Sequence, residues 1–154
     1  MPDAVSPLAE FFARDVCQRA TAPLRNGVEI AVKVDGCPDL MLVKTEGRVR
    51  VQAGAPARPD MTFHVPPAAI DSLCAETTTD IGEIGVAILR LMASADAALR
   101  VRAQVHIGLF DLLRGGYLGV LPLGGATVMK FLASKGLTNI GKIKDGLSRL
   151  RERK

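Results

Sequence analysis

Aromatic residues are scarce in this chain of 154 residues: they make up 4% of it, with no tryptophan and one tyrosine. Apolar residues nevertheless reach 48% and include five methionines, so the apolar content is mostly aliphatic. Charged residues make up 23%, a balance that indicates a globular chain and excludes a disordered one. The length suits one domain with one core. Aliphatic and methionine-rich surfaces adapt to flexible apolar partners, although an ordinary aliphatic core explains the composition equally well.

The chain also lacks the features of an exported or membrane-spanning protein. Its three cysteines, Cys17, Cys37 and Cys74, are odd in number and have no metal-ligand spacing, which argues against a disulfide framework. The first residues lack the basic and apolar segments of a signal peptide. No stretch of about 18 uncharged apolar residues occurs, because Pro122 and several glycines interrupt the nearest candidate, residues 115–129. These absences predict a protein of the reducing cytoplasm.

Catalytic and metal-binding patterns are missing as well. The two histidines, His64 and His106, fall on the polar side of predicted strands, and neither has a cysteine or glutamate at ligand spacing. No Gly-x-Ser-x-Gly nucleophile turn occurs, and the glycine-rich stretch 115–119 lacks the Lys-Ser/Thr ending of a phosphate-binding loop. We therefore expect no metal, no cofactor and no enzymatic activity.

Hydrophobic periodicity predicts the secondary structure. A helix is expected from the Ser6-Pro7 start signal to about Pro23. Alternating apolar residues predict strands at 28–34, 40–44 and 48–52, and the short turns between them require an antiparallel meander. The remaining pattern predicts a strand at 60–65, helices at 67–75 and 80–93, a strand at 99–105, and helices at 107–114, 122–134 and 139–153.

This order predicts an α+β fold: a five-stranded, mostly antiparallel sheet covered on one face by helices, with extra C-terminal helices. The opposite face of the sheet is predicted to be polar. Its expected residues are Glu29, Lys33, Arg48, Arg50, Thr62, His64, Arg100 and Arg102.

The order of elements, with several local phrases, resembles the sterol carrier protein 2 family over nearly the whole chain, as in bacterial sterol-binding-domain proteins of that type. The phrases are residues 32–36, a strand running into a turn, and residues 58–65, where Pro-Asp precedes a strand. The helix at 68–76, the strand at 99–105 and the helix at 107–113 also fall where that family has such elements. The resemblance implies a hydrophobic tunnel between sheet and helices that holds a sterol, acyl chain, phospholipid or isoprenoid quinone intermediate, without catalysis.

The sequence has more apolar helix faces than one sheet face can cover, and the surplus residues are candidates for ligand binding. Each apolar stripe, taken alone, equally suits an ordinary core. The candidate ligand-binding residues are Phe63, Ile84, Ile88, Leu91, Leu109, Phe110, Leu113, Tyr117, Leu121, Met129 and Leu132.

The C-terminal segment, residues 139–154, has the pattern of a basic amphipathic helix. Its Lys142, Lys144, Arg149, Arg151 and Arg153 would suit transient docking on an anionic membrane surface, at the inner membrane face. A solvated helix packed on its own domain is the alternative interpretation.

Two other functions remain open at this point. The surplus apolar surface could instead make a homodimer or bind a partner enzyme, so that the chain would be an accessory subunit of a lipid-modifying enzyme. Nucleic-acid binding is the weaker option, because the arginines of the polar sheet face have no aromatic platform beside them. We expect no nucleic-acid partner.

Overall fold

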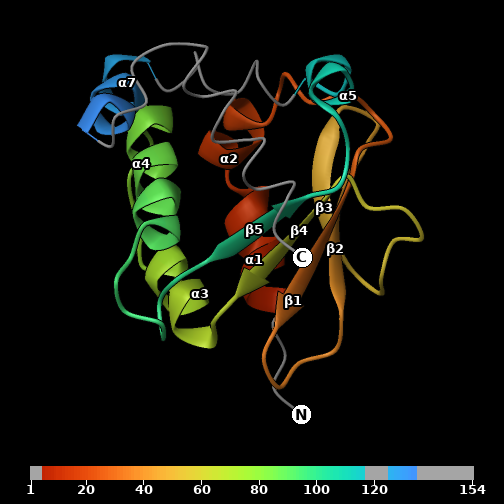
Figure 1. The fold of residues 1–154 in the computed structure, drawn as a ribbon, viewed down its shortest axis with the longest axis horizontal. Helices are drawn as coiled ribbons and strands as arrows, with labels where there is room; N and C mark the ends of the chain where they lie inside the picture. Colours follow the sequence, from red (N-terminus) through yellow and green to blue (C-terminus); the bar gives the residue numbers. More distant parts are fainter. Residues whose placement is uncertain (1–4, 117–124, 135–154) are drawn as a thin grey trace.

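The computed structural model describes residues 5–116 and 125–134. The predicted meander and its two following helices are present, and Figure 1 shows how the elements are arranged. The described elements are α1 (Val5–Ala13), α2 (Asp15–Ala20), β1 (Glu29–Val34), β2 (Leu40–Thr45), β3 (Arg48–Ala53), β4 (Met61–Val65), α3 (Pro67–Cys74), α4 (Ile81–Met92), β5 (Arg102–Val105), α5 (Leu109–Arg114) and α7 (Gly125–Ser134).

The five strands form one open, mixed sheet in the order β3-β2-β1-β4-β5. Strands β1, β2 and β3 pair antiparallel, as their short turns require, and β5 pairs antiparallel with β4. Strand β4 lies parallel to β1, with Ile30 opposite Met61 and Val34 opposite Val65. The predicted five-stranded, mostly antiparallel α+β fold is therefore confirmed.

The core lies between one face of the sheet and the helices. Phe11 of α1 and Leu40 of β2 are fully buried, and they share a cluster with Val32, Ile70 and Ile84 from β1, α3 and α4. Helix α4 is capped by Asp80, whose side chain accepts a hydrogen bond from the backbone N–H of Glu83 at 3.1 Å. Helix α7 packs on α4 at the far side from the sheet (Figure 1).

The predicted N-terminal helix is two helices, which corrects the expectation of a single helix from Ser6-Pro7 onward. Helix α1 already includes Val5, and the chain breaks at Arg14, whose ψ of 143° is extended. The guanidinium of Arg14 donates to the carbonyl oxygens of Cys74, at 2.8 Å, and Glu76 at the end of α3. The break between α1 and α2 thus places the Arg14 guanidinium where it can donate hydrogen bonds to carbonyl groups that have no partner within α3.

Two further expectations need correction. Strand β5 begins at Arg102 rather than residue 99, because Asp96 forms a turn whose carbonyl accepts from the N–H groups of Leu99 and Arg100. Thr62, expected on an exposed polar face, is only 6% exposed, and its hydroxyl lies 2.7 Å from Nε2 of His106. Arg100 lies outside the sheet and donates to the carbonyls of Ser94 and Ala95.

Candidate apolar binding site

An apolar cavity of about 200 Å³ lies between the sheet and the helices and is called the sheet cavity below. Its lining is apolar apart from Thr21. The lining residues are Leu8, Phe12, Thr21, Leu24, Val28, Ile30, Val32, Leu42, Val43, Val49, Val51, Phe63, Val65, Leu73, Ile88, Leu91 and Val101.

A second cavity, of about 190 Å³, lies among the helices and is called the helix cavity below. The two cavities share three lining residues: Phe12 of α1, Thr21 after α2, and Ile88 of α4. The complete lining is Phe11, Phe12, Cys17, Ala20, Thr21, Ile81, Ile84, Gly85, Ile88, Leu89 and Val128. Phe12, Thr21 and Ile88 therefore lie where the two spaces adjoin, and they are called the shared wall below.

The break between α1 and α2 places the wall between these cavities. Phe11 is fully buried in the core, whereas Phe12, the next residue, is partly buried between the two spaces. The two rings meet edge to face with centroids 5.2 Å apart. Burial raises the pKa of the neighbouring Cys17 thiol to about 11, against a smaller opposing effect of Arg14. Cys17, which lines the helix cavity, is therefore a buried, neutral thiol at pH 7.

The structure brings four of the candidate residues to the cavities. Phe63 and Leu91 line the sheet cavity, Ile84 lines the helix cavity, and Ile88 lines both. Leu132 of α7 is buried beside Val86 and Val128 in a separate cluster against α4, so it supports the helix cavity from behind.

The other candidates lie elsewhere. Phe110 is 70% exposed, so the structure does not place it with the cavity-lining residues. The guanidinium of Arg114 lies over its ring, 5.7 Å from the ring centroid. The side chains of Leu109, Leu113 and Met129 lie outside the described part of the structure, as do Tyr117 and Leu121 altogether. The predicted membrane-docking residues also lie outside the described residues: Lys142, Lys144, Arg149, Arg151 and Arg153.

Sequence reasoning missed the N-terminal half of the lining. Leu8 and Phe12 of α1, together with Val49 and Val51 of β3, form walls that the candidate residues do not include. Their periodicity was visible, because Val49 and Val51 alternate along a strand and Leu8 and Phe12 are four apart on a helix. The periodicity identified these side chains as inward-facing, but it did not show which inward-facing side chains line a cavity.

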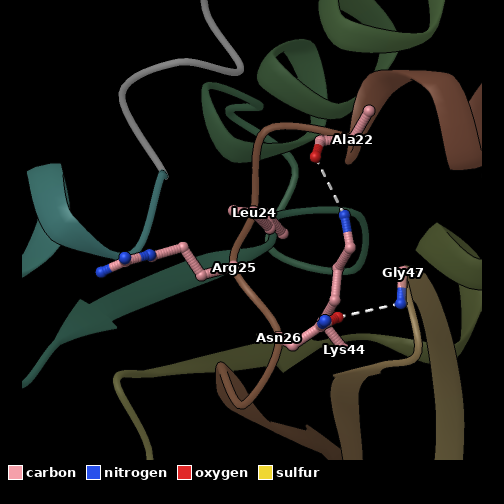
Figure 2. Close-up of a pocket in the computed structure, with 6 residues that line it drawn as sticks. All are labelled: Ala22, Leu24, Arg25, Asn26, Lys44 and Gly47. Carbon is pink, nitrogen blue, oxygen red and sulfur yellow. Dashed lines mark hydrogen bonds between the residues drawn. The ribbon is translucent and has the colours of Figure 1, made fainter.

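A polar pocket of about 650 Å³ opens at the surface beside the sheet cavity and is called the Lys44 pocket below. Figure 2 shows its lining: Ala22, Leu24, Arg25, Asn26, Lys44 and Gly47. Leu24 lines both this pocket and the sheet cavity. The rim is fixed by the side-chain oxygen of Asn26, which accepts from the backbone N–H of Gly47 at 2.9 Å.

Lys44 is the unusual residue of this pocket, since it is only 4% exposed. Its ammonium donates to the carbonyl oxygens of Thr21, at 2.8 Å, and Ala22, at 3.0 Å. Burial lowers the pKa of Lys44 below its usual value, because removing the cation from water disfavours the charged form. The pocket therefore contains a poorly hydrated amine at the edge of an apolar cavity.

Metal-ligand clusters and membrane-spanning helices are both absent from the described residues. No group of three or more histidine, cysteine, aspartate or glutamate side chains in residues 5–116 and 125–134 could hold a metal ion. No helix in the same ranges is long and apolar enough to span a bilayer.

Comparison with known proteins adds little to this geometry. No protein-family model matches the chain, and no curated protein matches it. Among solved structures, the chain is similar to one described as "UbiJ-SCP2 Ubiquinone synthesis protein". The two share 16% identity and a TM-score of 0.45, over 80% of this chain and 95% of that chain. Similarity of this degree carries no argument about function, and membership of the sterol carrier protein 2 family stays a prediction.

Proposed function

We propose that this protein binds a single-chain apolar lipid, without catalysis, in the sheet cavity and the adjoining helix cavity. The observation that carries the proposal is the shared wall: two apolar spaces of about 200 and about 190 Å³ that both border Phe12, Thr21 and Ile88. Well-packed interiors have few voids larger than a water molecule, so two adjacent apolar spaces of this size call for an occupant.

The size and chemistry of the cavities favour a flexible chain. An apolar cavity of about 150 Å³ in another protein stays dry and binds benzene, and small-molecule sites usually begin near about 300 Å³. Each cavity alone falls between these sizes, and the two together reach the range of a ligand site. A rigid sterol would need one undivided space, whereas an acyl or prenyl chain can bend past the Phe12–Ile88 wall.

The expected binding energy comes from the chain itself. Each buried methylene contributes about 0.8 kcal/mol, which corresponds to a roughly fourfold tighter Kd. Affinity should therefore rise steadily with chain length and stop rising once the cavities are full. A surface that binds lipids non-specifically has no such limit.

A series of straight-chain alcohols from hexan-1-ol to tetradecan-1-ol tests this, with binding measured by calorimetry below the solubility limit of each alcohol. We expect one molecule per chain, a roughly fourfold gain per methylene, and a chain length beyond which the gain ends. Absence of binding, or affinity that rises without any limit, would refute the proposal.

Two variants locate the binding. Ile88→Phe enlarges a side chain that lines both cavities, and Leu99→Phe enlarges a partly buried side chain that packs on the core without lining either. Phenylalanine exceeds isoleucine by about the volume of one methylene, so Ile88→Phe should weaken the binding of long alcohols by about fourfold, and Leu99→Phe should bind as the natural chain does. Equal effects would place the alcohol outside the cavities.

The same protein and alcohol samples also test the alternative that the chain self-associates instead of binding a lipid. Sedimentation at several protein concentrations, with and without decan-1-ol, separates a monomer that holds a ligand from a dimer that buries apolar helix faces. A concentration-dependent dimer that ignores the alcohols would favour the interaction-domain interpretation.

A further inference from the structure

Lys44 lies on the cavity-facing side of its strand. Side chains alternate along a strand, so Leu40, Leu42 and Lys44 of β2 point to the same face of the sheet. Leu40 is fully buried in the core and Leu42 lines the sheet cavity. Lys44 is the next residue in this row, at the end of the cavity where the Lys44 pocket opens. The Lys44 ammonium therefore lies at the end of the row of apolar side chains formed by Leu40 and Leu42, next to the opening of the Lys44 pocket.

The charge of Lys44 has no carboxylate partner among the described residues. Its two hydrogen-bond acceptors, the carbonyls of Thr21 and Ala22, are neutral, and neither of the ion pairs Arg19–Asp15 and Lys33–Asp39 includes it. An ammonium has three N–H donors. A buried cation without a counter-charge is costly, and proteins usually pair it.

Part of this arrangement has a structural explanation. Thr21 is the C-cap of α2, and a cation near the carbonyl end of a helix is stabilising. This role explains where the ammonium sits. It does not explain why the same residue lines an open pocket that shares Leu24 with the apolar cavity.

A second cation stands on the rim of the pocket. Arg25 is exposed, and Figure 2 shows its side chain extending away from Lys44. A long exposed side chain changes rotamer readily, and a guanidinium binds carboxylates and phosphates through paired N–H groups. The pocket thus combines a fixed cation at its base with a movable one at its rim.

We propose that the Lys44 pocket binds the anionic head, a carboxylate or phosphate, of the lipid whose chain occupies the sheet cavity. Lys44 contacts the head directly and Arg25 closes over it. The assignment rests on the proposed function, since it names the class of ligand for the same cavity: an acidic single-chain amphiphile rather than a neutral one.

Calorimetry with three ligands of equal chain length tests this: decanoate, decan-1-ol and decyl phosphate, at pH 7 and below the aggregation concentration of each. We expect the natural chain to bind decanoate and decyl phosphate at least about tenfold more tightly than decan-1-ol, the factor that about 1.4 kcal/mol represents. Equal affinity for the acids and the alcohol would overturn the headgroup site and leave the chain-binding proposal standing. Failure of all three to bind would overturn the proposed function itself.

Two variants assign the preference to the two cations. Lys44→Met keeps the apolar stem without the charge, and it should bind decan-1-ol within about twofold of the natural chain while losing the preference for the acids. Arg25→Gln changes an exposed residue, so it tests the site even where Lys44→Met does not fold, and it should weaken binding of the acids alone. A purely structural Lys44 predicts a lower melting temperature with the acid preference intact, and that result would refute the assignment.

Inorganic phosphate distinguishes a lipid head from a free anion. Phosphate at 10 mM should leave the melting temperature of the ligand-free protein unchanged, because the head is held only with its chain. Stabilisation by phosphate that is lost in Lys44→Met, without any preference for decyl phosphate over decan-1-ol, would assign the pocket to a free anion and overturn the headgroup proposal.

Discussion

Gly116, just after α5, is expected to be intolerant of any side chain. Its φ is +84°, a conformation that residues with a Cβ rarely adopt. A Cβ at this position would lie 1.9 Å from the carbonyl oxygen of Pro23 and 2.8 Å from its carbonyl carbon. Both are backbone atoms, so no side chain can move aside. The substitution Gly116→Ala must therefore push the chain after α5 away from residues 23–25.

The cost follows from two contributions. The left-handed conformation costs about 1–2 kcal/mol for alanine. Separation of the two segments also breaks the hydrogen bond that Arg25 N–H donates to the carbonyl of Gly115 at 2.9 Å, which is worth about 0.5–1.5 kcal/mol. We expect Gly116→Ala to lower the free energy of unfolding by about 2–3 kcal/mol, or to detach this segment locally at a similar cost.

Urea unfolding and amide hydrogen exchange measure these two outcomes. Gly116→Ala should lower the urea midpoint, accelerate exchange at the Arg25 amide, or do both. Gly108→Ala is the matched control, since its Cβ would meet nothing within 4 Å and its φ is not in the left-handed region; its effect should stay within about 0.5 kcal/mol. An unchanged midpoint together with unchanged exchange at Arg25 would refute the reasoning.

Three further predictions concern single groups. Cys17, whose pKa burial raises to about 11, should be alkylated by iodoacetamide at pH 8 about 100-fold more slowly in the folded than in the unfolded chain, as peptide mapping would show; equal rates would contradict the burial. Asp80→Ala should lower the free energy of unfolding by about 1 kcal/mol through loss of the α4 cap, whereas Asp80→Asn should restore most of it; the two variants unfolding alike in urea would argue against the cap. Burial lowers the pKa of Lys44 from 10.5, so the folded state binds fewer protons than the unfolded state between the folded and unfolded pKa values, and stability should rise with pH in that window. The unfolding free energy of the natural chain minus that of Lys44→Met should therefore increase as pH approaches 10.5. A decrease would refute the sign of this pH dependence.

The sheet and the helices on its face were predictable because their signals are local. Alternating valines define β1 and β3, turn residues separate the first three strands, and Asp80 marks the start of α4. No local sequence pattern predicts the parallel pairing of β4 with β1. It follows from the return of the chain after the β2–β3 hairpin, which tertiary packing decides.

Two of the three errors arose where tertiary contacts override the local pattern, and the third arose at a local turn. The break at Arg14 depends on carbonyls at the end of α3, 60 and 62 residues along the chain. Leu99 belongs to an alternating run, yet the turn at Asp96 removes it from the strand. Thr62 is buried because a histidine from outside its strand reaches its hydroxyl. For Arg14 and Thr62 a hydrogen bond between distant segments decides the outcome, whereas for Leu99 a local turn does.

The candidate site could be predicted only in part. Periodicity on α4 identified Ile84, Ile88 and Leu91, because a helix that faces the core shows its inner face in the sequence. It could not identify the wall made by Phe12, whose position depends on the break between α1 and α2. The sequence predicts Lys44 only as the last residue of a strand, and its location at the end of a cavity follows from the packing of residues 21–25 against that strand.

The central claim, that an apolar chain lies inside the sheet cavity and the helix cavity, is tested most directly by NMR on methyl-labelled protein with decan-1-ol bound. We predict nuclear Overhauser contacts between the methylenes of the alcohol and the methyl groups of Ile88 and Leu91, which line the cavities, and none to Leu99. Contacts confined to exposed groups, with the cavity methyls undisturbed, would contradict the account.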